Sequence, residues 1–230
     1  MATINIKESQ LFELCCECVK ALDFLQVLEI SHGEFKADQL LEKLTNILHL
    51  PFTTQTSENA SKQNNDAIAF SLFSAWFAVK LTAQLGDGFE MWTEINKASS
   101  LSLNYKVSVE TYAKNAKIKL NNREFLVDYY IHPQKHLHCP ILTIESESQE
   151  DGKFFDLSKL LLVSSPRRVY VGNIKTGKLE DAITKIKGIL DEALAAGAIN
   201  SSDQIVLILY KDEGQTTKLR IYDYDQYRHV

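Results

Sequence analysis

The segment PILTIESESQEDGKFFDLSKLLLVSSPRRVYVG, residues 140–172, determines the fold class that the sequence predicts. Residues 140–147 and 168–173 are expected strands, and the ILTI run of the first is typical of a strand that is buried on both faces. Between them, residues 154–163 have the three- and four-residue apolar spacing of a helix. A helix between two such strands indicates a parallel crossover, for which the right-handed connection is the rule.

The flanking sequence extends this unit into a sheet protein. Residues 67–85 are apolar nearly all round and end at the GDG of residues 86–88, which predicts a helix packed on more than one side. The other expected elements are strands over 90–95, 105–112, 124–131, 204–211 and 218–224, and a long helix over 179–196. The sequence therefore predicts an α/β fold with a mixed central sheet flanked by helices.

Residues 1–55 are expected to form a helical N-terminal extension in front of an α/β domain that covers residues 66–230. Apolar residues recur at three- and four-residue spacing between residues 11 and 28 and between residues 36 and 48, which predicts two amphipathic helices. The second helix ends before Pro51, because a proline disfavours helical geometry in the preceding residue. The polar stretch at residues 52–65 is typical of a loop or linker.

The composition is that of a globular protein, with 45% hydrophobic and 24% charged residues in 230. No apolar run approaches the roughly 18 residues of a membrane span, and MATINIKESQ lacks the pattern of a signal peptide. We therefore expect a cytoplasmic protein without a membrane partner. The net charge of −5 excludes a chain that is basic throughout. Residues 153–187 nevertheless carry eight Lys or Arg against three Asp or Glu, as a polyanion-binding surface or a solvated face would.

Two groups of metal-ligating residue types need an interpretation. Cys15, Cys16 and Cys18 fall within four residues, but no second pair follows at zinc-finger spacing, so we expect reduced cysteines that pack in a core. The segment HPQKHLHC, residues 132–139, contains three histidines and a cysteine between two expected strands. A polar turn is the expected structure there, with a zinc site or a contact to a substrate phosphate as the alternatives.

Acidic residues on two neighbouring expected strands form the sharpest functional pattern. Asp128 lies inside the apolar run FLVDYYI, and Glu145 and Glu147 end the strand PILTIESE. Because strand side chains alternate, the two glutamates share a face, and Asp128 can lie opposite them in a hairpin. Clustered carboxylates stay ionised when a cation lies between them, and their oxygens suit Mg²⁺ or Mn²⁺. A solvated acidic face is the alternative.

The order helix, strand, strand with Asp, strand with Glu-x-Glu, helix, strand resembles the restriction-endonuclease-like superfamily of PD-(D/E)XK phosphodiesterases. The resemblance covers roughly residues 67–175. It implies that Asp128 and Glu145 are metal ligands and that Glu147 occupies the position that is usually lysine, where the side chain positions or activates the water. It also implies a Mg²⁺ or Mn²⁺ cofactor and a nucleic-acid substrate.

The chain departs from the family pattern at two positions. Val127 replaces the proline before the aspartate, and Glu147 replaces the lysine. Some members with Glu there remain active, and in others the lysine has moved to the following helix, where Lys159 is the candidate and Lys153 the weaker one. Some members add an earlier carboxylate, for which Glu94 is the candidate.

The resemblance also implies a role for the basic segment, residues 153–187. Lys153, Arg167 and Arg168 are the candidates for binding the phosphate backbone of the nucleic acid. Lys159, on the helix near the metal site, would offset phosphate charge. Lys185 and Lys187 are expected to coat the solvent face of their helix.

Two functions from different classes follow. The first is a metal-dependent nuclease that hydrolyses DNA, or else RNA, with Asp128, Glu145, Glu147 and Lys159 as catalytic residues. The second is a catalytically inactive nuclease-like fold that acts as a nucleic-acid-binding or protein-interaction module. In that case the N-terminal helices would bind a protein partner or form a homodimer.

Overall fold

The computed structural model describes residues 11–22, 26–29, 32–35, 37–48, 62–93, 103–122, 126–136, 138–147, 153–174, 177–212 and 217–224. The helices are α1 (Leu11–Lys20), α2 (Ala37–Ile47), α3 (Lys62–Leu85), α4 (Leu103–Asn115), α5 (Lys153–Leu162) and α6 (Leu179–Ala195). The strands are β1 (Gln26–Glu29), β2 (His32–Phe35), β3 (Phe89–Thr93), β4 (Lys119–Asn122), β5 (Tyr129–Pro133), β6 (Leu142–Glu147), β7 (Arg167–Asn173), β8 (Gln204–Asp212) and β9 (Thr217–Asp223). Within these ranges no helix is long and apolar enough to cross a membrane.

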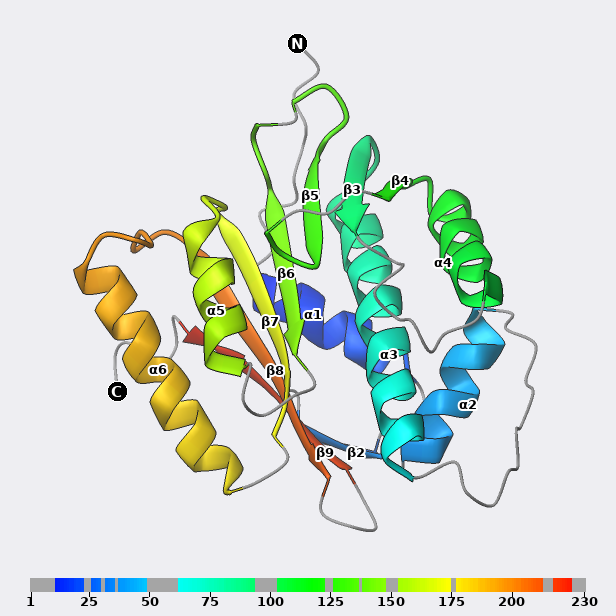
Figure 1. Cartoon of the computed structure of the whole chain (residues 1–230), viewed down its shortest axis with the longest axis horizontal. Coiled ribbons are helices and arrows are strands. Elements are labelled where there is room, and N and C mark those ends of the chain that lie inside the picture. The colour runs from blue at the N-terminus through cyan, green and yellow to red at the C-terminus, as the bar shows by residue number, and fades with distance from the viewer. Residues whose placement is uncertain are drawn as a thin grey trace.

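The described strands form one mixed sheet in the order β1-β2-β9-β8-β7-β6-β5-β3-β4 (Figure 1). β6, β7 and β8 run parallel, and so do β3 and β4, while the other neighbouring pairs are antiparallel. The α/β fold class and the mixed sheet flanked by helices are thereby confirmed. The strand–helix–strand unit over residues 140–172 is also confirmed, because β6 and β7 pair in parallel and α5 connects them.

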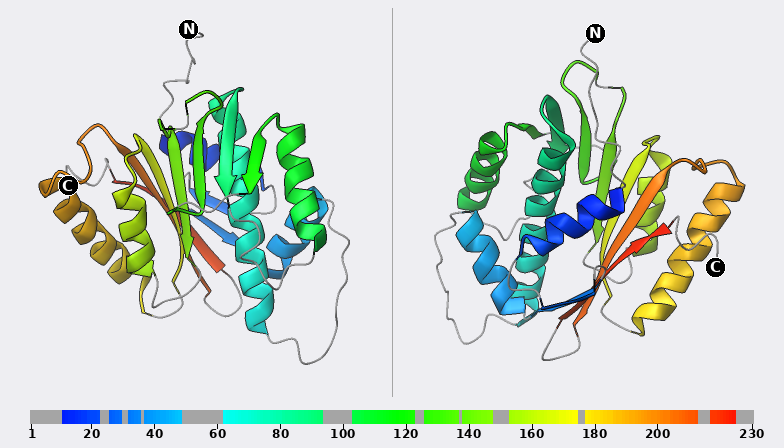
Figure 2. Two further views of the ribbon diagram at one scale, coloured as in Figure 1. Left: turned by 45° about the horizontal axis from the view of Figure 1, so that its top comes forward. Right: turned by 180° about the vertical axis from the view of Figure 1, so that it is seen from behind.

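Two hydrophobic clusters pack on opposite faces of the sheet. Helices α1 to α4 cover one face, and α5 and α6 cover the other, as Figures 1 and 2 show. Strand alternation explains the division: Leu142 and Ile144 of β6 point toward the first cluster. Glu145, the next residue along β6, therefore points to the face that carries α5. This alternation positions the candidate site.

The first fifty residues differ from the helical extension that the sequence predicts. Residues 26–29 and 32–35 form β1 and β2, and β2 pairs with β9 through His32↔Arg220 to Phe35↔Thr217. The helix expected over residues 11–28 therefore ends at Lys20, and α2 confirms only the second helix. The described part of residues 1–55 is not an extension, because it shares its sheet and its core with the rest of the chain.

The apolar face of α1 is buried in that core. Leu11, Leu14, Cys15, Cys16 and Cys18 are all at most 5% exposed. Burial raises the pKa of all three thiols, of Cys16 to about 11, so they are protonated packing groups and not reactive thiolates. The face that the sequence offers for a protein partner is therefore covered by the protein's own core.

Residues 105–112, for which the sequence predicts a strand, lie in α4 instead. Val109 and Ala113, one helical turn apart, are buried against the first cluster, and Tyr112 packs beside them. The alternating valines fit a strand locally, but the i, i+4 burial decides the structure. β4, at residues 119–122, is absent from the predicted elements and pairs in parallel with β3.

Candidate functional site

Asp128 and Glu145 lie together where β5 begins and β6 ends. The antiparallel pairing of β5 with β6 places Tyr129 opposite Ile144, so the residues just outside this pair are neighbours. The Asp128 backbone N–H donates to Glu145 Oε2 at 2.9 Å. In return, the Ser146 N–H and hydroxyl donate to Asp128 Oδ2 at 3.0 and 2.5 Å. The expected proximity of these two acids is therefore a feature of the structure.

Lys159 joins the cluster from α5. Its Nζ donates to Glu145 Oε1 at 2.8 Å and also forms an ion pair with Asp156, one turn earlier on the same helix. The Glu145 side chain is 1% exposed and the Lys159 side chain 25% exposed. The cluster is thus a buried carboxylate bonded to a cation that also contacts Asp156.

The electrostatics of the cluster are dominated by burial. Burial and the adjacent Asp128 carboxylate raise the pKa of Glu145 to about 8, against the opposing effect of the hydrogen bonds from Lys159 and the Asp128 amide. Burial would lower the pKa of Lys159, but its bonds to Asp156 and Glu145 outweigh this and raise that pKa above its ordinary value. Lys159 is therefore a cation at neutral pH and not a proton acceptor.

Glu147 lies two residues beyond Glu145 on the same face of β6, and it is half-buried. Its Cα partner on β7 is Gly172, and that of Glu145 is Tyr170. Burial raises the pKa of Tyr170, and the charges of Glu147, Asp156 and Glu145 add to that effect. The Tyr170 side chain is thus within the electrostatic reach of all three carboxylates.

Gly172 leaves room for the Tyr170 ring. A Cβ at residue 172 would lie 2.7 Å from Tyr170 Cε1 and 3.1 Å from Leu209 Cδ2.

We expect Gly172→Ala to lower the free energy of unfolding by about 1–3 kcal/mol, because the ring must shift within a packed core. Chemical denaturation measures this change. Gly188→Ala is the control: it lies in α6 with open space around it, and should be neutral or stabilise by about 0.5–1 kcal/mol. Equal stability of Gly172→Ala and the wild type would contradict this packing.

The arginines that are expected to bind nucleic acid lie at the start of β7. Thr143 pairs with Arg168 and Glu145 with Tyr170, so Arg168 lies two residues, about 7 Å, from the level of Glu145. Arg168 is 2% exposed and donates to Asp203 at 2.7 Å and to the Val163 carbonyl at 2.9 Å. The buried guanidinium of Arg168 therefore holds the fold and is not available to a phosphate.

The remaining expected residues are placed only in part. Arg167 is half-buried beside Arg168, and burial lowers the pKa of its guanidinium. Lys153 is the first residue of α5, and its side chain lies outside the described residues, as does the whole of Glu94. The structure therefore does not bear on the roles expected of Lys153 and Glu94.

The histidine-rich segment forms the connection between β5 and β6. His136, His138 and Cys139 are exposed, which agrees with a polar turn. His132 differs: it is 2% exposed, its Nδ1 lies 2.8 Å from the Pro133 carbonyl oxygen, and its ring packs edge-on against Trp92. The turn lies at the opposite end of β5 from Asp128, so contact with a phosphate at the carboxylates is not supported.

The chemical type of the ligand atoms at Asp128 and Glu145 fits a hard divalent cation. Both are carboxylates, and Mg²⁺ commonly takes one or two carboxylates and completes its shell with water and phosphate oxygens. The raised pKa of Glu145 reflects its burial and the like charge of Asp128. Among the described residues, no three His, Cys, Asp or Glu side chains lie close enough to form a larger metal site.

The sequence reasoning misses two members of the cluster. Ser146 enters it only as the residue between the two glutamates, although it donates twice to Asp128. Asp156 is counted only as one of the three acidic residues in the basic segment 153–187. Its i, i+3 spacing from Lys159 is the available signal, since residues at that spacing are neighbours on a helix.

No family model matches the chain, and neither the curated proteins nor the solved structures contain a match.

Proposed function

We propose that this protein is a Mg²⁺- or Mn²⁺-dependent nuclease that hydrolyses phosphodiester bonds of DNA. The observation that carries the proposal is the meeting of Asp128, Glu145 and Lys159, from the β5 and β6 ends and α5, in one bonded cluster. The element order α3, β3, β5, β6, α5, β7 supports it, because this is the order on which the resemblance to the PD-(D/E)XK phosphodiesterases rests. In this chain α4 and β4 are inserted between β3 and β5.

In the proposed site, Asp128 and Glu145 would hold the metal ion. The ion supplies Lewis-acid activation of the phosphodiester and of a water molecule. Ser146 fixes the Asp128 carboxylate through its two hydrogen bonds, so this ligand is oriented before substrate binds. Lys159 holds Glu145 and offers a positive charge to a phosphate oxygen.

Glu147 is the proposed proton acceptor for the attacking water. It shares the Glu145 face of β6 but is less buried than Glu145. Lys159 is unsuited to that task, because its raised pKa keeps it protonated. The roles of the two residues in water activation are thus divided: Glu147 accepts the proton, and Lys159 offsets charge.

Calorimetric titration of Mn²⁺ tests the metal site. We expect wild type to bind Mn²⁺ and Asp128→Asn to lose most of this affinity, because the amide keeps the hydrogen-bond acceptor for Ser146 but removes the charge. Asp181→Asn, in the first turn of α6, is the matched control and should bind like wild type. Absence of Mn²⁺ binding in wild type, or equal binding in Asp128→Asn, would refute the proposed site.

A catalytically inactive nuclease-like fold that binds nucleic acid is the second candidate. One observation favours it: both oxygens of Glu145 accept hydrogen bonds from within the protein, as they would in a structural network. The titration separates the two candidates, because a structural network predicts no Mn²⁺ binding. A protein partner on the apolar face of α1 has no such support, since that face is buried.

A further inference from the structure

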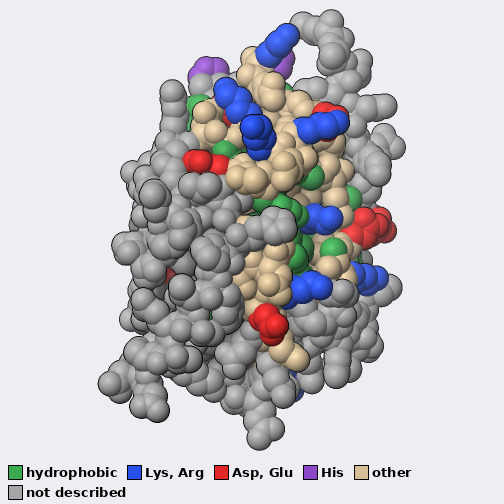
Figure 3. All heavy atoms as spheres, turned by 90° about the vertical axis from the view of Figure 1, so that its right-hand side faces the viewer, with side chains coloured by type: hydrophobic (Ala, Val, Ile, Leu, Met, Phe, Trp, Pro, Cys, Tyr) green, Lys and Arg blue, Asp and Glu red, His purple; other side chains and the backbone are tan. Residues whose placement is uncertain are grey.

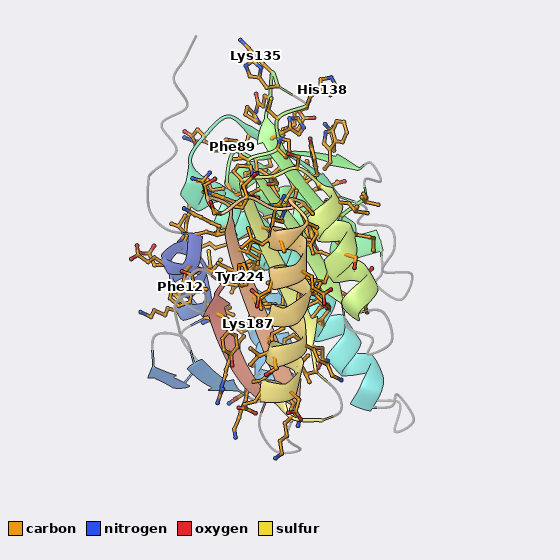
Figure 4. The ribbon with its side chains drawn as sticks, turned by 90° about the vertical axis from the view of Figure 1, so that its left-hand side faces the viewer. Phe12, Phe89, Lys135, His138, Lys187 and Tyr224 are labelled. Atoms are coloured by element: carbon orange, nitrogen blue, oxygen red, sulfur yellow. The ribbon has the colours of Figure 1, made fainter. Side chains whose placement is uncertain are left out.

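A group of lysine and histidine side chains that the proposed chemistry does not use lies at one end of the sheet. We name it the basic end and define it as Lys114, Lys117, Lys119, Lys135, His136 and His138. All six side chains are exposed. They come from two separate segments, the α4–β4 region and the turn between β5 and β6. Figure 3 shows histidine and several basic side chains at one end of the molecule, with further basic and acidic side chains beyond it, and Figure 4 shows Lys135 and His138 projecting from that end.

The sheet topology brings these two segments together. β3 lies between β4 and β5, and Glu90 of β3 pairs with Lys119 on one side and with His132 on the other. With strands about 4.8 Å apart, the two flanking positions are about 10 Å apart. The Gln134 N–H donates to the Gly88 carbonyl at 3.0 Å, which ties the β5–β6 turn to the start of β3. The basic end is therefore a consequence of strand order.

Acidic residues offset this charge only in part. Asp87 lies 3.8 Å from Lys117, but both side chains are more than 75% exposed, and such pairs contribute little. Glu90 is buried beneath Lys119, whose Nζ donates to it at 3.0 Å. Glu110 lies one turn further back on α4. The four lysines outnumber Asp87, Glu90 and Glu110 by one, and a local positive excess in a chain with a net charge of −5 favours an anionic partner.

Lys119 lies on the face of the sheet that carries the carboxylate cluster, whereas Lys114 belongs to α4, which covers the other face. The Lys119 side chain reaches Glu90, and Trp92 Nε1 donates to the same carboxylate at 3.1 Å, so these residues share a face. Trp92 also packs with the cluster under α5 and α6. From Pro133 to Asp128 is about 17 Å along β5, the length of about five nucleotides of one strand at about 3.4 Å each.

We propose that the basic end binds the phosphate backbone of the nucleic acid whose cleavage is proposed above, at a distance of about five nucleotides from Asp128. The inference rests on the proposed function for the identity of the partner. It differs from the sequence expectation, which places the backbone contacts at Lys153, Arg167 and Arg168. The lysines would contribute affinity that is independent of base sequence and falls with salt.

The test compares two triple variants with the same loss of charge. Lys114→Gln/Lys117→Asn/Lys135→Gln changes the basic end; Asn is chosen at residue 117 because its φ of 58° is the left-handed region that Asn tolerates. Lys119 is retained because it neutralises the buried Glu90. Lys178→Gln/Lys185→Gln/Lys187→Gln is the control on α6, where Figure 4 shows Lys187 far from the hairpin tip. Circular dichroism verifies that both variants fold.

Binding is read by fluorescence anisotropy of a labelled DNA duplex of about 20 base pairs, in EDTA so that cleavage does not interfere. We expect the basic-end variant to bind at least about tenfold more weakly at about 50 mM salt, with a smaller slope of log Kd against log salt. The control should bind within about twofold of wild type. Equal weakening in both variants, no weakening in either, or no duplex binding by wild type would overturn the inference.

The two proposals fail separately in this design. Duplex binding that depends on the basic end, without any cleavage by wild type in either Mg²⁺ or Mn²⁺, supports the basic end and refutes the nuclease proposal. Cleavage by wild type with unchanged duplex binding by the basic-end variant refutes only the basic end.

Discussion

Glu145→Gln should become more stable relative to wild type as the pH rises from about 5 to about 9. The pKa of Glu145 is raised to about 8 in the folded protein, and an unfolded glutamate has a pKa of about 4.3. Below the unfolded pKa both states hold the proton. Between the two values only the folded state holds it, so wild type loses stability as the pH rises toward 8. The amide that replaces the carboxyl in the variant does not titrate.

The expected gain of the variant across this window is on the order of 4 kcal/mol, because each of the three pH units between 5 and the folded pKa of about 8 contributes about 1.4 kcal/mol. A constant offset is also expected, since the new amide meets two donors, Lys159 and the Asp128 N–H, and can accept from only one. Urea denaturation at each pH measures the difference. Glu192→Gln, at an exposed position on α6, is the control. Its free energy of unfolding should differ from that of wild type by the same amount at every pH. If the difference in free energy of unfolding between Glu145→Gln and wild type did not change with pH, the raised pKa of the buried carboxyl would be contradicted.

Lys159→Met should destabilise the protein by about 2–4 kcal/mol at about pH 9 and by less at about pH 6. Its removal leaves Glu145 and Asp156 without their shared cation, and Glu145 is 1% exposed. At the lower pH, Glu145 is protonated, so the loss of Lys159 leaves no buried charge at residue 145. Urea denaturation at the two pH values measures both costs. The pH dependence distinguishes this electrostatic cost from lost packing, which would be the same at both values.

A double-mutant cycle isolates the contact between the two side chains. Lys159→Met in the Glu145→Gln background should cost about 1–2 kcal/mol less than in wild type at about pH 9, because no buried charge remains at residue 145. Additive effects of the two substitutions, measured by the same denaturation experiment, would show that Lys159 and Glu145 do not interact.

The part of the fold that the sequence predicts correctly is the part in which local pattern and burial agree. The β6–α5–β7 unit is predicted because residues 140–147 and 168–173 are apolar enough to be buried on both faces. α4 is not, because Val107 and Val109 alternate like strand residues while the packing of Val109 and Ala113 favours a helix. β2, and with it β1, depends on pairing with β9 at the other end of the chain, which no local pattern contains.

The candidate site shows the same division. Strand alternation is sufficient to place Asp128 near Glu145, and the hydrogen bond between them bears this out. Strand alternation cannot show that Arg168 forms an ion pair with Asp203, because these residues are 35 apart in the sequence. The structure also adds Asp156 to the network, which explains why Lys159 is held as a cation.

Nicking of supercoiled plasmid tests the central claim, that Asp128 and Glu145 form the centre of a metal-dependent nuclease. We predict that wild type and Glu192→Gln nick the plasmid in Mg²⁺ or Mn²⁺ but not in EDTA. Asp128→Asn should be slower by more than about a hundredfold. Nicking by Asp128→Asn at the wild-type rate, or no nicking by wild type with either metal, would contradict the account.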